Sequence, residues 1–154
     1  MPKIKERQEY VRKLLLRGLT AGVIAGGSLI ASPASATPGG SGVTGVVISQ
    51  STLNGMDYIV RRITLPPGQS TGWHYHQHAI FGVVQNGTLS HFDSSCKSDG
   101  VYKKGSTITE PGGSKYVHIG RNLGKKPVVL DVVYIMPHGT SLSTDAPNPG
   151  CDFQ

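Results

Sequence analysis

The sequence predicts an all-β domain, either a sandwich or a small barrel of short antiparallel strands. Its 154 residues include 21 glycines and 10 prolines, which disfavour long helices. After residue 36 no window keeps an apolar period of 3.6 residues, and short runs rich in Val, Ile and Thr are separated by turn signals. About seven short strands spaced in this way are typical of a sandwich or barrel.

The individual strands follow from these runs. Asn54-Gly55 predicts a turn, and Asn86-Gly87 predicts a type I′ hairpin, because both residue types tolerate positive φ. Residues 128–136 are almost continuously apolar, which predicts a central strand buried on both faces. Asp131 interrupts that run and is expected to face outward. The expected strands are 43–53, 57–65, 74–84, 88–94, 106–111, 115–122 and 128–136.

The N-terminal segment is typical of a secretory signal peptide over residues 1–36. Residues 1–17 are charged and basic, residues 18–31 are uncharged, and Ala34-Ser35-Ala36 forms an A-x-A cleavage site. We therefore expect a secreted or cell-envelope protein, with a retained N-terminal anchor as the alternative. The apolar stretch is shorter than the roughly 20 residues of a membrane-spanning helix, so no stable span is expected.

The remaining chain divides into a linker over 37–44, a single domain over 45–137 and a C-terminal tail over 138–154. Removal of the leader changes the formal charge from +6 (15 minus 9) to +2 (9 minus 7). No run of Lys and Arg in the remainder is longer than two residues. This charge pattern lacks the basic cluster that is typical of a nucleic-acid-binding surface.

Cys96 and Cys151 are the only cysteines. In an exported chain the default expectation is a disulfide, which would tie the C-terminal tail to a mid-chain loop. Two free thiols, or one cysteine acting as a soft metal ligand, are the alternatives.

The stretch "HYHQH" places three histidines at alternate positions, His74, His76 and His78. In a strand, residues two apart share a face, so these imidazoles would lie side by side. Imidazole suits Zn, Cu, Fe and Ni. Three histidines on a solvated strand face are the alternative, and a metal site needs a further ligand from a distant part of the chain.

Two blocks of the sequence resemble the paired motifs of the cupin superfamily. The first runs from Gly68 through His74 and His76, and the second from Gly105 through His118. The resemblance covers about residues 45–137, and implies a compact jelly-roll-like antiparallel β-barrel with a metal at its mouth. The ligands that it implies are His74, His76 and His118.

The chain departs from the family pattern at two points. Ile80 stands where the family usually has a glutamate, and four residues instead of two separate Gly113 from His118. His78 could supply a fourth nitrogen, line the mouth of the barrel, or simply be solvated. Glu110 is expected to be solvated in a turn, although it is also the nearest substitute for the missing carboxylate. A degenerate cupin without metal is a further alternative.

Other aromatic side chains near these motifs have expected places. Trp73 and Tyr75 have the opposite parity to the histidines and should pack outside the barrel. Tyr116 shares parity with His118 and could line the same pocket. His91 is expected at the surface unless its parity turns it inward.

These features predict an exported metal-binding cupin. Its predicted function is that of a metal-dependent enzyme acting on an unidentified small molecule. The alternative is a non-enzymatic metal or small-ligand binding protein. Three histidines do not distinguish Fe, Mn, Zn, Ni or Cu. The exposed edge "VVISQ" could pair two copies in a homodimer.

Overall fold

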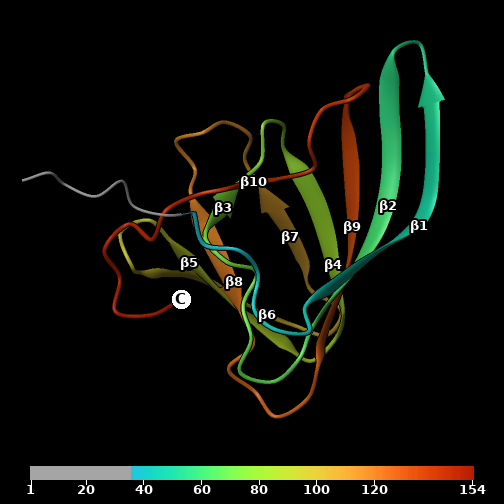
Figure 1. Cartoon of the computed structure of the whole chain (residues 1–154). Coiled ribbons are helices and arrows are strands. Elements are labelled where there is room, and N and C mark those ends of the chain that lie inside the picture. Colours follow the sequence, from blue (N-terminus) through green and yellow to red (C-terminus); the bar gives the residue numbers. More distant parts are fainter. Residues whose placement is uncertain (1–35) are drawn as a thin grey trace, which may run out of the picture. The chain divides into compact units, whose positions relative to one another are not determined.

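The computed structural model describes residues 36–154, which contain two five-stranded antiparallel sheets and no helix (Figure 1). The first sheet is ordered β1 (Thr44–Leu53), β2 (Met56–Leu65), β9 (Val128–Pro137), β4 (Ile80–Asn86) and β7 (Thr107–Glu110). The second is ordered β10 (Thr144–Asp145), β3 (His74–Tyr75), β8 (His118–Arg121), β5 (Thr88–Asp93) and β6 (Ser98–Lys103). The all-β, jelly-roll prediction is confirmed, and the expected signal peptide lies outside the described residues except for Ala36.

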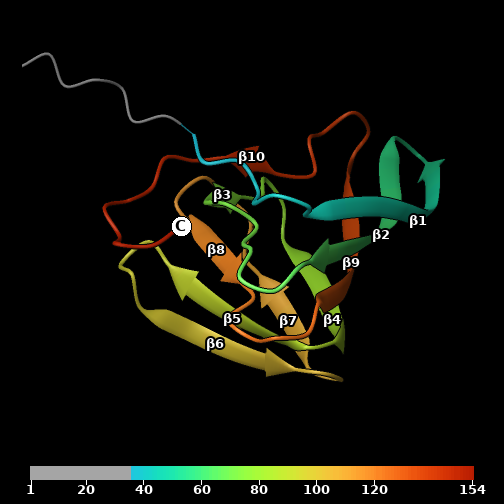
Figure 2. The same cartoon turned by 60° about the horizontal axis from the view of Figure 1, so that its bottom comes forward.

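The main core lies on the inner face of the first sheet, and Leu89 of the second sheet belongs to it. Figure 2 shows the arrangement of the two sheets. Alternate residues of β2, β4 and β9 point into this core, as a half-buried strand requires. Its buried members are Ile59, Leu65, Ile80, Val84, Leu89, Ile108, Val128, Leu130, Val132, Tyr134 and Met136.

Strand β9 is central, between β2 and β4, but it is not buried on both faces. Burial alternates along it, so the two-sided prediction was wrong: its outer face carries partly exposed Val133 and Ile135. The outward orientation of Asp131 is confirmed. Asp131 accepts two hydrogen bonds from Arg62, of 2.7 and 2.8 Å, across the β2–β9 pair.

The two Asn-Gly pairs behave differently. Asn54 and Gly55 both have positive φ and connect β1 to β2 as a two-residue hairpin, with Leu53 opposite Met56. Asn86-Gly87 does not form the expected hairpin, because β4 and β5 belong to different sheets. The chain crosses between sheets there, and the Asn86 side chain instead donates to the carbonyl of Pro127 at 2.8 Å.

The single strand expected over residues 74–84 is in fact two strands in different sheets. β3 ends at Tyr75 and β4 begins at Ile80, so the parity argument ends before His78. His76 turns inward from the connecting segment, whereas His78 is exposed. The sequence does not predict strands β6 and β10. The residues of β6 show no strong alternation of apolar and polar side chains, and β10 is only two residues long.

Strand β1 forms an edge of the first sheet and is almost fully exposed. Three consecutive apolar residues, Val46, Val47 and Ile48, are 63%, 48% and 52% exposed. Exposed edges of this kind offer unpaired backbone groups to another strand.

A second, smaller apolar cluster lies on the outer face of the second sheet, beneath the C-terminal tail. Trp73, Ile119 and Ala146 are its buried members, and Phe153 stacks on Trp73 with ring centroids 5.9 Å apart. Trp73 therefore packs outside the barrel, as expected. In the part of the chain that the structure describes, no helix has the length and apolar character to cross a membrane.

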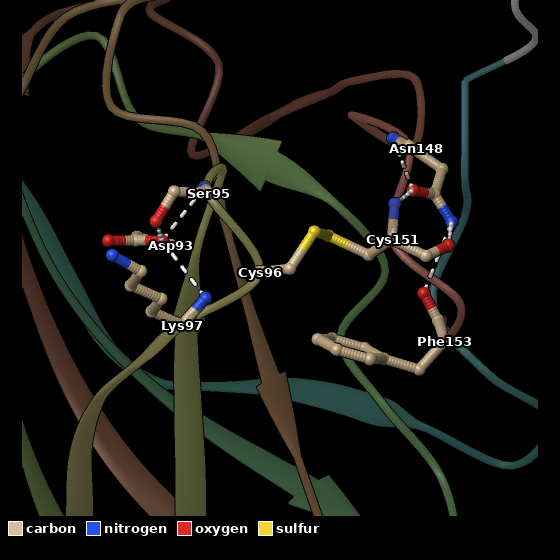
Figure 3. Close-up of a disulfide and its surroundings, with 8 residues drawn as sticks. Asp93, Ser95, Cys96, Lys97, Asn148, Cys151 and Phe153 are labelled. Carbon is tan, nitrogen blue, oxygen red and sulfur yellow. Dashed lines mark hydrogen bonds between the residues drawn. A yellow bond between two sulfur atoms is a disulfide. The ribbon is translucent and has the colours of Figure 1, made fainter.

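A disulfide between Cys96 and Cys151 ties this tail to the β5–β6 turn, which confirms the expected bond (Figure 3). On the tail side, Asn148 accepts hydrogen bonds from the backbone of Gly150 and Cys151 and donates to the carbonyls of Cys151 and Phe153. The tail is thus held by one covalent bond and a local hydrogen-bond network.

The segment expected to be a linker, residues 37–44, is held against the domain. Thr37 is 6% exposed, and its backbone N–H donates to the carbonyl of Ala146 at 3.0 Å. Its hydroxyl accepts from the backbone N–H of Trp73 at 2.7 Å and donates to the carbonyl of Ala146 at 3.0 Å. Gly40 adds a bond to the carbonyl of Ser70.

Replacing Thr37 by valine is expected to destabilise the protein by about 1–3 kcal/mol, because the buried N–H of Trp73 loses its partner. Denaturant unfolding of both proteins measures the difference. Thr37→Ser keeps the hydroxyl and is the matched control. Equal stability of the valine and serine variants would contradict this role of Thr37.

Candidate metal centre

Four buried side chains converge between the two sheets: His74, His76, Glu110 and His118. Each offers one ligand atom, and these atoms all lie within 4.8 Å of one another. The structure therefore brings together the three histidines that the sequence singled out and adds a carboxylate to them.

Strand pairing positions two of the histidines. His74 on β3 lies directly opposite His118 on β8, and their ring centroids are 4.4 Å apart. His76 follows the end of β3, where its carbonyl accepts a 2.8 Å hydrogen bond from the N–H of Gly113 in the β7–β8 turn. The second motif thus holds the first in place.

Glu110, at the end of β7, supplies the carboxylate. Its Oε2 lies 3.0 Å from Nε2 of both His76 and His118, so the expectation of a solvated Glu110 was wrong. Glu110 pairs with Ile80 across β4–β7, so it enters the site beside the position where the family glutamate is missing. Its shared parity with buried Ile108 was the sequence signal that could have found it.

The three imidazoles are oriented by their second nitrogen. Because a backbone carbonyl can only accept, Nδ1 of each ring carries a proton, and in the neutral ring Nε2 is left with a lone pair. This is how metal-ligating histidines are usually fixed. The three contacts from Nδ1 are to the carbonyls of Gly72 for His74 (2.9 Å), Leu142 for His76 (2.6 Å) and Tyr116 for His118 (3.0 Å).

This arrangement leaves one buried nitrogen without a hydrogen-bond partner, and a cation would supply a partner. Nε2 of His118 is fully buried and, despite its closeness to Glu110, has no hydrogen-bond partner of suitable geometry among the described residues. Buried polar atoms without a partner are costly and rare. Lone pairs of imidazoles and a carboxylate that face one another fit a divalent metal ion.

Burial and neighbouring charges favour the protonation states of His74 and Glu110 that a cation requires. Burial, with the charges of His118 and His76, lowers the pKa of His74 to about 3. Burial alone would raise the pKa of the Glu110 carboxyl, but the nearby rings of His118, His76 and His91 lower it well below its usual value. At neutral pH the site thus offers a neutral His74 and an anionic Glu110, both suited to a cation.

His91 stands behind the carboxylate, and its expected surface position was wrong. It is 1% exposed on β5, with Nε2 3.3 Å from Oε1 of Glu110 and Nδ1 2.6 Å from Oδ1 of Asp99. Burial alone would lower the pKa of His91, but Glu110 and then Asp99 raise it. Tyr116 donates to Oδ2 of Asp99 at 3.1 Å, which completes a chain of polar groups behind the site.

The cluster opens onto a cavity of about 180 Å³ inside the barrel. His74, His76 and Glu110 line one part of it, and aliphatic side chains such as Ile80, Leu130 and Val132 line another. His78 is exposed and does not belong to the cluster. A small molecule in this cavity would touch both the polar cluster and an apolar wall.

Comparison with known proteins agrees with this geometry. Residues 61–136 match the family model described as "Cupin domain". This range contains all four residues of the cluster. No curated protein matches the sequence.

Solved structures share the fold. An uncharacterized protein with a double-stranded β-helix domain from Klebsiella pneumoniae has a TM-score of 0.56 and 21% identity, over 70% of this chain and 87% of that one. A cupin domain from Bordetella pertussis has a TM-score of 0.50 and 22% identity, over 66% and 97%. A cupin superfamily protein from Desulfitobacterium hafniense has a TM-score of 0.50 and 10% identity, over 62% and 79%.

Proposed function

We propose that this chain, whose residues 61–136 match the cupin-domain family model, belongs to the cupin superfamily and is an exported metal-dependent enzyme acting on a small molecule. The observation that carries the proposal is the buried cluster of three histidines and one carboxylate beside a cavity. Fold alone does not select an activity, so the proposal rests on the site.

The metal ligands proposed are His74, His76 and His118, as the sequence predicts, with Glu110 as a fourth. The chemistry that a bound divalent ion supplies is Lewis acidity, which polarises an oxygen of the ligand. The chain's own part is to orient the three rings through their Nδ1 contacts. His91 contacts the carboxylate of Glu110 from behind and is itself bound by Asp99.

The competing function is a non-enzymatic metal-binding protein, and the presence of four potential ligands favours it. Four protein ligands complete the tetrahedral shell of a structural zinc site. An ion that prefers six ligands would keep positions open toward the cavity. The identity of the metal therefore separates the two functions: zinc in a closed shell favours storage or structure, and iron or manganese favours catalysis.

The disulfide supports a location outside the cytoplasm, since such bonds persist in oxidising compartments. Cleavage after Ala36 by the secretion machinery is part of the proposal. So is a homodimer through the exposed edge of β1, whose apolar residues Val46 to Ile48 would be covered by a second copy.

Elemental analysis of the protein purified from its native export compartment tests the metal. We expect about one divalent ion per chain, and loss of that ion in His76→Ala, because metal affinity depends on each deprotonated ligand. His78→Ala is the matched control, since His78 is a neighbouring but exposed histidine. A metal-free wild-type protein, or equal metal content in His76→Ala, would contradict the proposal.

A further inference from the structure

One charged side chain of the barrel interior has no part in the metal cluster. Arg61 lies half-buried on β2 and lines the cavity, in a row with the apolar Ile59, Ile63 and Leu65. Asp57 begins this row, but its carboxylate is hydrogen-bonded to Thr52 and His138. It faces the same side of the first sheet as its β9 partner, the buried Val132. A guanidinium among aliphatic residues is expensive unless it is paired or has a ligand.

The next residue shows what a structural arginine looks like in this strand. Arg62 points outward and forms a two-pronged ion pair with Asp131. Arg61, in contrast, has no carboxylate within 4.0 Å among the described residues. Its hydrogen bond to protein is a long one, from Nη2 to the carbonyl of Gly45 at 3.4 Å. Asp145 also lines the cavity, but it is exposed and forms no ion pair with Arg61.

The neighbouring strand leaves room for this guanidinium. A Cβ added at Gly45 would collide with three atoms of the Arg61 head group, Nη2, Cζ and Nε. The flat guanidinium therefore rests on the backbone of β1, where any larger residue would displace it. Gly45 also lines the cavity, so the head group is held at its wall.

Tyr134 connects this end of the cavity to the metal cluster. Its ring meets the ring of His76 edge-on at 6.0 Å, and the side chain is 4% exposed. Tyr134 also lines the cavity, and its phenolic O–H can donate to an anion.

We propose that Arg61 and Tyr134 form an anion subsite that binds the carboxylate of a small aliphatic acid. The apolar body of the acid would lie against Leu130 and Val132, and an oxo or hydroxyl oxygen at its other end would face the metal cluster. The planar fork of arginine matches a carboxylate, which it binds through two parallel hydrogen bonds. This inference rests on the proposed function and names its substrate class.

Nuclear magnetic resonance of the ¹⁵N-labelled protein provides the test. The described part of the chain has three arginines, Arg61, Arg62 and Arg121, whose Nε–Hε signals report on each guanidinium separately. The zinc-loaded protein is titrated with 4-oxopentanoate, butanoate and hexanoate, and in parallel with the neutral 4-oxopentanamide. We expect a saturable shift of the Arg61 signal with the acids, none with the amide, and unchanged Arg62 and Arg121 signals.

Three variants sharpen the result. Arg61→Gln should weaken binding of 4-oxopentanoate by about tenfold or more, as expected when a charged hydrogen-bond donor is lost. Gly45→Ala keeps the arginine but displaces its head group, and should weaken binding as well. Arg62→Gln is the matched control on the outer face and should bind like the wild type.

Failure of this inference is distinguishable from failure of the metal proposal. Equal binding by Arg61→Gln, or no shift of the Arg61 signal with any of the three acids, would overturn the anion subsite while zinc binding remained intact. If zinc does not bind, the acids are titrated into the metal-free protein. The Arg61 signal then gives the answer on its own.

Discussion

Replacing Glu110 by glutamine is expected to weaken divalent-metal binding by more than about 100-fold, because even partners outside the coordination shell contribute about 10–100-fold. The carboxylate lies 3.0 Å from two of the imidazole nitrogens and brings the only negative charge of the four-residue cluster. Glutamine has nearly the same shape but no charge. Competition with a chelating dye measures the affinity of both proteins.

The pKa of Glu110 fixes the sign of the pH dependence. Because this pKa lies well below its usual value, the carboxylate is charged at neutral and mildly acidic pH, and the difference between wild type and Glu110→Gln should persist across that range. The difference should vanish only in strong acid, where Glu110 becomes protonated. Asp152→Asn, at an exposed carboxylate of the tail, is the control. An unchanged affinity in Glu110→Gln would remove the carboxylate from the site.

Loss of the Cys96–Cys151 bond is the second large effect. The bond closes a loop of 55 residues; the loop-entropy relation gives a stabilisation of about 4 kcal/mol for a loop of this size. The same bond places Phe153 over Trp73 and beneath the guanidinium of Arg121, whose central carbon lies 4.5 Å from the Phe153 ring centroid. The double variant Cys96→Ser/Cys151→Ser should lower the free energy of unfolding by about that amount.

Two measurements check this expectation. Denaturant unfolding gives the free energy, and the fluorescence of Trp73, the single tryptophan of the chain, reports on the tail. Release of the tail should shift the emission of this buried ring to longer wavelength. Reduction of the wild type should reproduce the variant. The same stability and emission with and without the bond would show that the tail is held by its non-covalent contacts alone.

The metal cluster would tolerate loss of this bond better than loss of Glu110. Trp73 precedes His74 and faces away from the cluster, so the disulfide-tied end of the tail packs on the face opposite the cluster. The carbonyl of Leu142, which contacts His76, lies nine residues before Cys151. Loss of the disulfide should therefore lower the free energy of unfolding more than it lowers the metal affinity.

The local sequence pattern was enough to predict most of the strands and three residues of the candidate site. Alternating β-branched runs predicted most strands, and Asn54-Gly55 marked the hairpin between β1 and β2. The histidine motifs pointed to His74, His76 and His118, which the structure brings together. These features depend on residues close in sequence, or on a recurring pair of motifs.

Tertiary structure alone decided the partners of each strand, and with them the composition of the site. Asn86-Gly87 has the residues of a hairpin, but β4 and β5 pair with other strands, so the same dipeptide connects two sheets. The break between β3 and β4 turns His76 inward and leaves His78 in solvent. Period-two parity holds only within one continuous strand, so it could not carry across this break.

Glu110, His91 and Arg61 show the same difference between what the sequence pattern determines and what strand pairing determines. Their inward orientation is a matter of parity, but their chemistry depends on what lies opposite. Glu110 meets the histidines because β7 pairs with β4 at Ile80, and His91 is buried because β5 lies between β6 and β8. The sequence by itself determined which side chains could bind a metal or an anion. Only long-range strand pairing, which a local pattern does not encode, decided which of them share one interior.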